Sequence, residues 1–189
     1  MVSPIRVGVL ALQGSFEPHA AAVRRLGHEA VLVRAPADLA GLTHLILPGG
    51  ESTTLHHLLE LFGLREAILL RAQRAELALF GTCAGAILLG ADDGTRPPRF
   101  GLLDATLSRN AFGSQVDSFQ APIEVEELAG GALLGTFIRA PKFARVGPRA
   151  RVLARLQGEP VLVEQPGLLA ASFHPELTAD DRLLERFLG

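Results

Sequence analysis

Cysteine, tryptophan, tyrosine and long apolar runs are scarce or missing in this 189-residue chain. With one cysteine, neither an intramolecular disulfide framework nor a zinc site made of several cysteines is possible. A lone thiol fits a reducing compartment, so we expect a cytoplasmic protein. The longest stretch without a charged residue, at 77–91, is too short to cross a bilayer. The N-terminus shows no secretory signal, and we expect no membrane span.

An excess of one charge is also missing. Lys and Arg total 18 and Asp and Glu total 20, so the formal net charge is −2. This balance attracts neither nucleic acid nor an anionic membrane, and without Trp or Tyr any base stacking would depend on phenylalanine alone. We therefore expect no nucleic-acid or membrane partner. The length suits one domain with a full core, so we take residues 1–189 as a single domain.

The N-terminal half alternates short apolar runs with helical patterns. Its first run is rich in Val and Leu, which indicates a strand buried on both faces of a sheet. The alternation favours a mostly parallel sheet covered by helices on both faces. The expected strands are 5–12, 30–33, 44–47 and 77–80, and the expected helices are 15–26, 52–62 and 65–74, with Ser15 and Ser52 as caps.

The C-terminal half is different, because strand-like segments follow one another across tight turns. Gly130-Gly131, Gly147-Pro148 and Gly158-Glu159-Pro160 supply the turns, and Thr178 is expected to cap a terminal helix. We predict an α/β fold of three layers, with a mostly parallel central sheet flanked by helices and antiparallel strands or hairpins in the C-terminal half. The expected strands here are 105–108, 123–127, 133–139, 152–156, 161–164 and 169–173.

Cys83 is the candidate nucleophile. It lies where a predicted buried strand meets a short apolar helix, within Gly81-Thr82-Cys83-Ala84-Gly85. The pattern G-x-C-x-G follows the logic of a nucleophile elbow, in which small flanking residues allow a strained turn. The N-terminus of the following helix favours the thiolate over the thiol. The pentapeptide alone leaves open the alternative of a buried, inert cysteine.

A thiolate nucleophile needs a proton-transfer partner and a group that orients it. His174 follows a predicted strand, in Ser172-Phe173-His174-Pro175-Glu176. In an extended segment His174 and Glu176 point to the same side, so Glu176 can hold the imidazole in the useful tautomer. The alternative is a surface loop with an incidental histidine. Of the other histidines, His44 is ambiguous, and those expected in solvent are His19, His28, His56 and His57.

Pro48-Gly49-Gly50-Glu51-Ser52-Thr53 closes a predicted strand and opens a helix. Consecutive glycines let the backbone approach a ligand and turn N–H groups toward an oxyanion. The segment is not a Walker motif, because no lysine follows it and the chain has only Lys142. A plain turn with a helix cap is the alternative reading.

The segments around Cys83 and His174 together resemble the class I (triad) glutamine amidotransferases. Further blocks occur in the order found in one family of these, the glutaminase subunits of pyridoxal 5′-phosphate synthases, and they cover most of the chain. One departure is that Pro18 precedes His19, where such proteins usually carry a Glu-His pair, and we expect only a local adjustment. The further blocks are Leu12-Gln13-Gly14, Pro48-Gly49-Gly50-Glu51-Ser52-Thr53, Arg109-Asn110 with Phe112-Gly113 and Gln115, Asp117-Ser118-Phe119, and Phe137-Ile138-Arg139-Ala140-Pro141.

The resemblance implies a class I glutamine amidotransferase-like, flavodoxin-like fold and hydrolysis of L-glutamine to L-glutamate and ammonia. It implies that Cys83 attacks the carboxamide to form a glutamyl thioester, and that His174 acts as general base and then protonates the leaving ammonia. Glu176 would orient His174, and the backbone N–H groups of Gly50 and Ala84 would form the oxyanion hole. Neither a cofactor nor a metal ion is expected.

The resemblance also implies how the rest of glutamine is bound and where the ammonia goes. A cation for the α-carboxylate and an anion for the α-ammonium are the expected complement. The ammonia would pass to a (β/α)8-barrel synthase subunit, within a large hetero-oligomer, for vitamin B6 biosynthesis. Gln13 lies in the loop that meets this synthase, so we expect weak activity alone and strong activation by the partner. The residues implied in substrate binding are Gly50, Glu51, Ser52, Arg109, Ile138 and Arg139.

Three alternatives stay open at this stage. The chain could be the glutaminase of another ammonia-dependent synthase, such as the histidine-pathway one, which shares the triad. It could be a small cysteine hydrolase, either a peptidase or a related stress protein with a similar elbow, although those lack the blocks of the second half. It could also be a non-catalytic binding module of the same fold, for which Cys83→Ala would alter packing alone.

Overall fold

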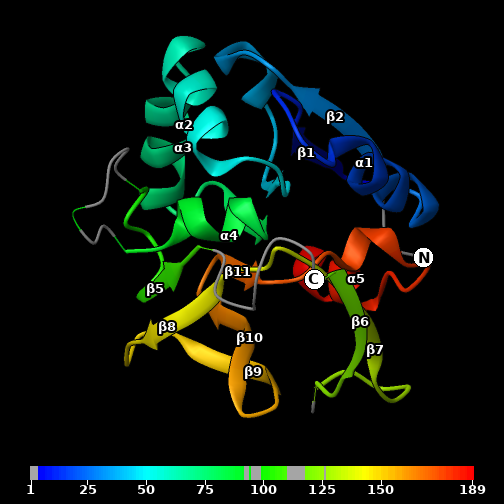
Figure 1. Ribbon diagram of the computed structural model, residues 1–189. Helices are drawn as coiled ribbons and strands as arrows, with labels where there is room; N and C mark the ends of the chain where they lie inside the picture. The colour runs from blue at the N-terminus through cyan, green and yellow to red at the C-terminus, as the bar shows by residue number, and fades with distance from the viewer. Residues whose placement is uncertain (1–3, 92–93, 95–98, 110–117, 126) are drawn as a thin grey trace.

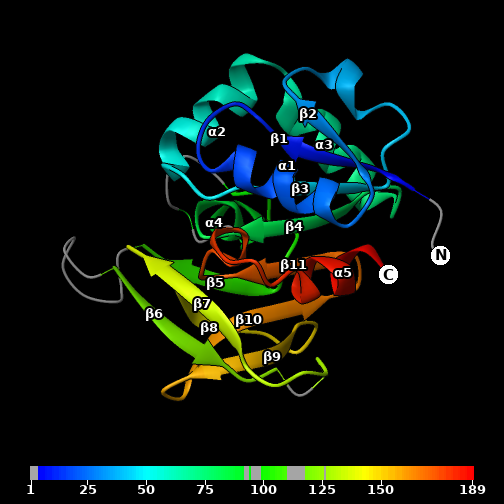
Figure 2. The same ribbon diagram turned by 90° about the vertical axis from the view of Figure 1, so that its right-hand side faces the viewer.

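The computed structural model describes residues 4–91, 94, 99–109, 118–125 and 127–189. Its centre is a seven-stranded sheet in the order β2-β1-β3-β4-β11-β10-β9, which Figure 2 shows from top to bottom. The strands from β2 to β11 are parallel, and β10 and β9 continue the sheet in antiparallel fashion. These strands are β1 (Arg6–Leu10), β2 (Glu29–Val33), β3 (His44–Leu47), β4 (Ala78–Thr82), β9 (Arg151–Leu156), β10 (Glu159–Gln165) and β11 (Leu168–Ala171).

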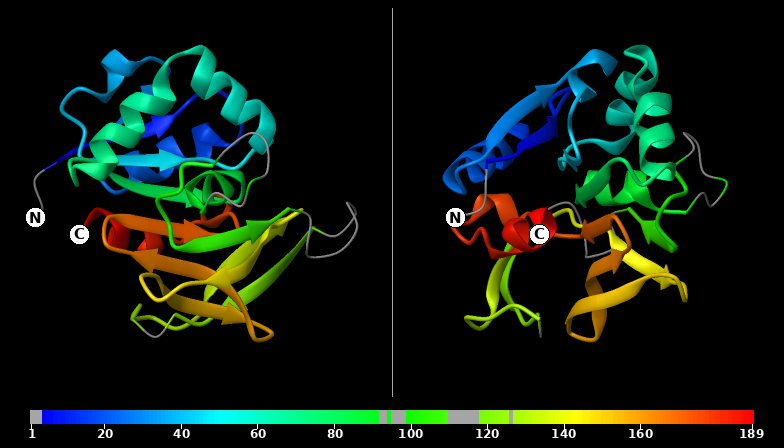
Figure 3. Two further views of the ribbon diagram at one scale, coloured as in Figure 1. Left: turned by 90° about the vertical axis from the view of Figure 1, so that its left-hand side faces the viewer. Right: turned by 180° about the vertical axis from the view of Figure 1, so that it is seen from behind.

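Helices cover both faces of this sheet (Figures 1 and 3). One face carries α2 (Ser52–Leu61), α3 (Leu64–Gln73) and α4 (Ala84–Leu89). The other face carries α1 (Phe16–Arg25) and α5 (Arg182–Leu188). None of the helices in the described ranges is long and apolar enough to cross a membrane.

Adjacent residues of one strand supply two separate cores. In β3, Leu45 and Leu47 belong to the core under α2 and α3, whereas Ile46 belongs to the core under α1 and α5. All three are fully buried, because successive side chains of a strand point to opposite faces and both faces are covered. The continuous apolar run of this strand in the sequence follows from burial on two sides.

Two small antiparallel sheets complete the C-terminal half. In the first, β5 (Ala105–Ser108) pairs with β8 (Lys142–Val146). In the second, β6 (Ser118–Ile123) pairs with β7 (Leu133–Ile138), and Figure 2 shows both pairs beside the β9–β10 hairpin. The fold class predicted from the sequence is therefore confirmed: parallel strands with helices, then antiparallel hairpins.

Three details differ from the sequence prediction. The strand expected at 123–127 lies earlier and ends at Ile123, where its pairing with β7 stops. Strand β8 was not predicted, because its pairing partner β5 lies more than thirty residues away and no local turn announces it. The terminal helix begins after Asp181 rather than Thr178, since the Thr178 hydroxyl instead donates to the Pro175 carbonyl oxygen at 2.9 Å.

Candidate active site

Three neighbouring parallel strands end at one edge of the sheet. β3, β4 and β11 lead into Gly49-Gly50, Cys83 and the segment with His174, respectively. Ala171 of β11 pairs with Thr82 of β4 in parallel register, so both chains leave the sheet at the same level. Ligands of open α/β sheets bind beyond this carboxyl edge. The topology therefore brings together segments that are distant in sequence.

Cys83 occupies a strained turn between β4 and α4. Its backbone has φ 50° and ψ −106°, a conformation that side-chain-bearing residues rarely adopt. A Cβ on Gly81 would lie 2.6 Å from the Gly85 backbone, and one on Gly85 would lie 1.9 Å from the Leu47 carbonyl oxygen. The two glycines of G-x-C-x-G are thus required by backbone packing, as the elbow interpretation predicts.

His174 is held from two sides opposite Cys83. Its backbone N–H donates to the Thr136 carbonyl oxygen of β7 at 2.8 Å, and its Nδ1 lies 2.7 Å from Glu176 Oε1. Burial opposes a charged imidazole, but hydrogen bonds with Cys83 and Glu176 outweigh it and raise the pKa of His174 to about 10. The imidazole is therefore protonated at neutral pH, with Nδ1–H donated to Glu176.

Glu176, in the short 3₁₀ turn η2 (Pro175–Leu177), has a side chain with 0% exposure. Its carboxylate accepts from the Ser15 hydroxyl at 2.8 Å, and His19 Nε2 lies 3.3 Å from its second oxygen. Burial opposes ionisation, but His19 and the hydrogen bonds from His174 and Ser15 outweigh it and lower the pKa of Glu176. Ser15 was expected to cap α1, yet its side chain makes no cap hydrogen bond and binds Glu176 instead.

Two of the four histidines expected in solvent are buried, so that prediction was wrong for them. His19 is 2% exposed and His56 is 6% exposed. Each lies on the apolar side of its helix, His19 one turn before buried Val23 and His56 three residues before buried Leu59. The spacing from these apolar residues indicated burial, but histidine is polar and was therefore assigned to the solvent-exposed side. The exposed or partly exposed histidines are His28, His44 and His57.

The N-cap of α2 is Glu51, not Ser52 as predicted. The Glu51 carboxylate accepts from the N–H groups of Thr53 at 2.9 Å and Thr54 at 2.6 Å, whereas Ser52 is the first helical residue and is buried. Slight desolvation opposes ionisation, but these hydrogen bonds outweigh it and lower the pKa of Glu51 to about 2. Glu51 therefore presents a fixed negative charge beside the turn.

The Gly49-Gly50 turn is packed between two side chains. A Cβ on Gly49 would lie 2.3 Å from the His174 ring, and one on Gly50 would lie 2.3 Å from the Gln13 amide nitrogen. Gln13 Nε2 also donates to the Glu51 carbonyl oxygen at 3.1 Å. A side chain at Gly49 would meet the His174 ring, and one at Gly50 would displace the Gln13 amide that supports the turn.

A pocket of about 320 Å³ opens between these segments. Arg109 reaches its rim, where Nη1 donates to the Thr53 hydroxyl at 3.0 Å. Gln13 and Glu176 lie behind the pocket wall, which for Glu176 means behind His174. The residues predicted from the sequence that line the pocket are Gly50, Glu51, Ser52, Cys83, Ala84, Arg109, Ile138, Arg139 and His174. Among the described residues, no group of His, Cys, Asp or Glu is arranged to hold a metal ion.

One further feature of the pocket was not predicted. Arg139 has φ 45°, so the chain turns sharply where β7 ends at the pocket. The preceding carbonyl oxygen, of Ile138, lies 3.9 Å from Cys83 Sγ. The sequence gives no warning of this turn, because glycine and asparagine are the residues typical of positive φ. The arrangement as a whole suits acyl transfer, with a sulfur nucleophile, a protonated imidazole and a fixed carboxylate.

Comparison with known proteins agrees with this chemistry. The family model described as the SNO glutamine amidotransferase family matches residues 9–188. The chain belongs to the SNO glutamine amidotransferase family. Among curated relatives of this SNO-family chain, pyridoxal 5′-phosphate synthase subunit PdxT of Thermus thermophilus is 56% identical over 184 residues, covering 96% of this chain and 95% of the relative. The protein of the same name from Deinococcus radiodurans is 52% identical, covering 97% and 95%.

A solved structure shows the same fold at high similarity. The crystal structure of a glutamine amidotransferase is 53% identical to this SNO-family chain and superposes with a TM-score of 0.91, covering 96% of each chain. These comparisons confirm the resemblance and the fold class that the sequence indicated.

Proposed function

We propose that this SNO-family chain is the glutaminase subunit of a pyridoxal 5′-phosphate synthase. The observation that carries the chemistry is the placement of Cys83, His174 and Glu176, in which a buried carboxylate holds a protonated imidazole beside the Cys83 sulfur at one pocket. Relatives that are 56% and 52% identical bear the name of that synthase subunit, which supports the same assembly here.

In the first half-reaction the Cys83 sulfur attacks the side-chain carbonyl carbon of L-glutamine. A C–S bond forms and the carbonyl electron pair moves onto oxygen. When the tetrahedral intermediate collapses, the C–N bond breaks and His174 gives its proton to the leaving nitrogen, which departs as ammonia. The raised pKa of His174 supports this step, because the imidazole enters the reaction already protonated. The product on the enzyme is a glutamyl thioester.

In the second half-reaction water hydrolyses the thioester. His174, now neutral, takes a proton from the attacking water, the C–S bond breaks, and L-glutamate leaves. The C–S bonding pair returns to the Cys83 sulfur and His174 carries a proton again, which restores the starting state. Glu176 stays ionised throughout and holds Nδ1–H, so that Nε2 faces the reacting atoms.

The remaining pocket residues bind and polarise the substrate. Backbone N–H groups of Gly50 and Ala84 stabilise the oxyanion, and losing one such donor typically costs on the order of 100-fold in rate. Glu51 is ionised at neutral pH and suits the α-ammonium group. Arg109 suits the α-carboxylate. The substrate-binding set also includes Ser52 and the Ile138-Arg139 backbone.

The ammonia product calls for a partner, because free ammonia is protonated and lost in water. We assign the receiving role to a (β/α)8-barrel synthase subunit within a large hetero-oligomer. Docking acts through the loop with Gln13, whose side chain already supports the Glu51 carbonyl and the Gly50 turn. In this proposal residues 1–189 act as one glutaminase domain in the cytoplasm.

The test measures ammonia released from L-glutamine by the wild-type chain and by Cys83→Ala, each with and without the synthase subunit. We expect weak wild-type activity alone, strong activation by the synthase, and none with Cys83→Ala under either condition. Equal activity in the two proteins would contradict the assignment of Cys83. Full wild-type activity without the synthase would contradict activation by the partner. No ammonia with the synthase present would contradict the proposed function.

A further inference from the structure

Two residues at the start of α1 contact Glu176, and the reaction steps above use neither. Ser15 directly precedes the helix and His19 lies four residues later, so both face the same side. The Ser15 hydroxyl donates to Glu176 Oε1 at 2.8 Å, and His19 Nε2 lies 3.3 Å from Oε2. One turn of helix therefore touches both oxygens of the carboxylate.

The protonation state of His19 follows from its surroundings. Burial lowers the pKa of His19, so the ring is neutral at neutral pH. Its Nε2 faces both the ionised Glu176 Oε2 and the Thr82 hydroxyl oxygen, which lies at 3.1 Å. A nitrogen lone pair aimed at a carboxylate is repelled, so Nε2 carries the hydrogen. Its hydrogen bond goes to the Thr82 hydroxyl oxygen, while Oε2 lies close by without a hydrogen bond. The contact with Oε2 is an N–H dipole against a charge.

We propose that Ser15 and His19 are positioning residues of the triad, which hold the Glu176 carboxylate ionised and oriented toward His174. The inference rests on the proposed function, since it concerns the same site. Oε2 is fully buried and accepts no hydrogen bond from the described residues, so the N–H dipole of His19 at 3.3 Å is what stabilises its charge from the helix side. A buried carboxylate that loses a donor becomes harder to ionise, and a protonated Glu176 cannot stabilise the His174 cation.

Ser15 also contacts the Gly49-Gly50 turn. Its backbone N–H donates to the Gly49 carbonyl oxygen at 3.1 Å while its hydroxyl binds Glu176. Replacing Ser15 with alanine removes the hydroxyl and keeps the backbone contact. This variant therefore tests the support of Glu176 separately from the support of the turn, and it removes only one partly buried oxygen atom.

The pH dependence has a defined direction. The titratable groups that face Glu176 are His19 of α1 and His174 of its own segment, with Cys83 on the far side of His174. Removing the Ser15 or His19 donor raises the pKa of Glu176. The acid limb of kcat/KM, where Glu176 becomes protonated, then moves to higher pH. The pKa of His174 falls, because its carboxylate partner weakens.

The experiment compares wild type, Ser15→Ala, His19→Ala and His19→Gln, all assayed with the synthase subunit present. His19→Gln retains an N–H donor at nearly the same reach as the imidazole. We expect His19→Ala to lower kcat by about 10- to 100-fold, the usual cost of losing a supporting contact at a site, with KM changed less than about twofold. His19→Gln should recover most of kcat and the wild-type acid limb, and Ser15→Ala should shift both quantities in the same direction as His19→Ala. The matched control is His57→Gln, which changes an exposed histidine and should leave kcat unchanged.

A second measurement needs no substrate. The His174 imidazole is titrated by NMR in wild type, Ser15→Ala, His19→Ala and His19→Gln. Its pKa, about 10 in wild type, should fall in both alanine variants and hold in His19→Gln. If both alanine variants keep the kcat, the acid limb and the His174 titration of wild type, the inference is overturned. The proposed function still stands in that case. A folded His19→Gln as impaired as His19→Ala would also overturn it. If His19→Ala does not fold, Ser15→Ala and His19→Gln decide the matter. A wild-type protein inactive with glutamine would overturn the proposed function, while the NMR titration would still test the support of Glu176.

Discussion

Two clusters of ionisable side chains join helices to strands in this molecule, and they lie in opposite surroundings. The triad cluster consists of His19, His174 and Glu176, whose side chains are 3%, 8% and 0% exposed. Each of its groups has a displaced pKa, because burial penalises charge and close partners restore it selectively.

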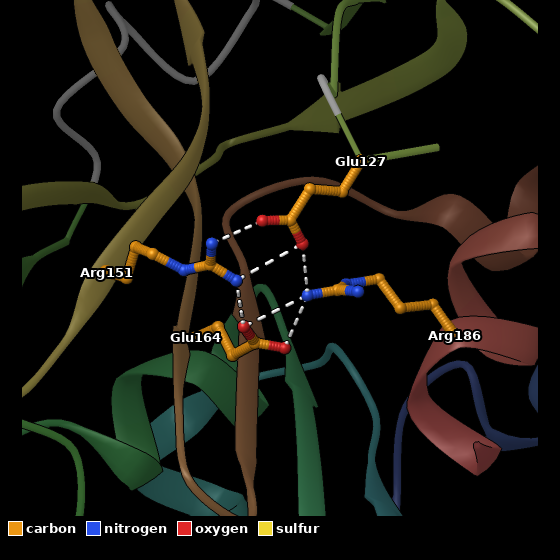
Figure 4. A network of polar contacts seen from close by, with 4 residues as sticks. All are labelled: Glu127, Arg151, Glu164 and Arg186. Carbon is orange, nitrogen blue, oxygen red and sulfur yellow. Dashed lines mark hydrogen bonds and ion pairs between the residues drawn. The ribbon is translucent and has the colours of Figure 1, made fainter. Parts of the chain in front are cut away.

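The second cluster, the arginine–glutamate network, faces water at the other end of the sheet. Figure 4 shows its four side chains converging from β9, β10, α5 and the segment after β6. Glu164 lies 2.8 Å from both Arg151 and Arg186, and Glu127 contacts the same two arginines. Their exposed fractions run from 22% to 57%, so water and salt screen these pairs. Of the two clusters, the buried one therefore has the stronger influence on the protonation state of its members, including His174.

The largest expected contrast is in activity. Glu176→Gln removes the charge behind His174 and should lower kcat by on the order of 10³- to 10⁴-fold, the loss typical of a triad carboxylate converted to an amide. Glu164→Gln makes the same substitution in the arginine–glutamate network and should leave kcat within about twofold. Steady-state ammonia release with the synthase present measures both. Similar losses of kcat in the two variants would contradict the expected difference between the two clusters.

Backbone packing gives the next contrast. Gly85→Ala puts a Cβ 1.9 Å from the Leu47 carbonyl oxygen and should destabilise the fold by about 3 kcal/mol or more. Gly158→Ala, in the β9–β10 turn, meets nothing within 4 Å and costs only the strain of φ +84°, about 1 kcal/mol. Urea unfolding of both variants measures which of them loses more stability. A Gly85 variant as stable as the Gly158 variant would contradict the packed elbow.

The dependence of stability on pH provides a third contrast. The folded pKa of His174, about 10, lies above its ordinary value near 6.5, so its contribution is fully present below about pH 6.5 and is lost as the pH rises through 10. The stability difference between wild type and His174→Gln should therefore shrink over this range. The difference between wild type and Glu164→Gln should stay flat, because ordinary glutamate and arginine side chains titrate outside this range. Unfolding free energies of wild type and both variants, measured at several pH values, test these two expectations.

The smallest expected effect is the stability of the arginine–glutamate network itself. Glu164→Gln should lower the free energy of unfolding by about 1 kcal/mol or less at low salt. The loss should shrink further at roughly 0.5 M NaCl, because the Debye length is then only a few ångströms. Thermal or urea unfolding at two salt concentrations measures this. A large, salt-independent loss would show that the network behaves as a buried cluster.

Much of the fold was predictable because local signals agreed. The apolar run of β1, the break between the helices expected at 52–62 and 65–74 and the elbow at Cys83 each identified a boundary within a few residues. The caps expected at Ser15 and Ser52 failed for different reasons. Ser15 stands at the N-cap position of α1, but its hydroxyl binds Glu176, whereas α2 begins one residue early and Glu51 is its N-cap.

The sequence alone determined the residue types of the site and the strand–turn–helix context of each, because elbow glycines and strand ends are local features. The tertiary structure alone decided that β11 lies beside β4, which brings His174 to Cys83 although the two are 91 positions apart in the sequence. It also decided that His19 is buried against Glu176, because the face that a helix presents depends on the sheet it covers. Burial and proximity are long-range properties, and they set the pKa values on which the proposed chemistry depends.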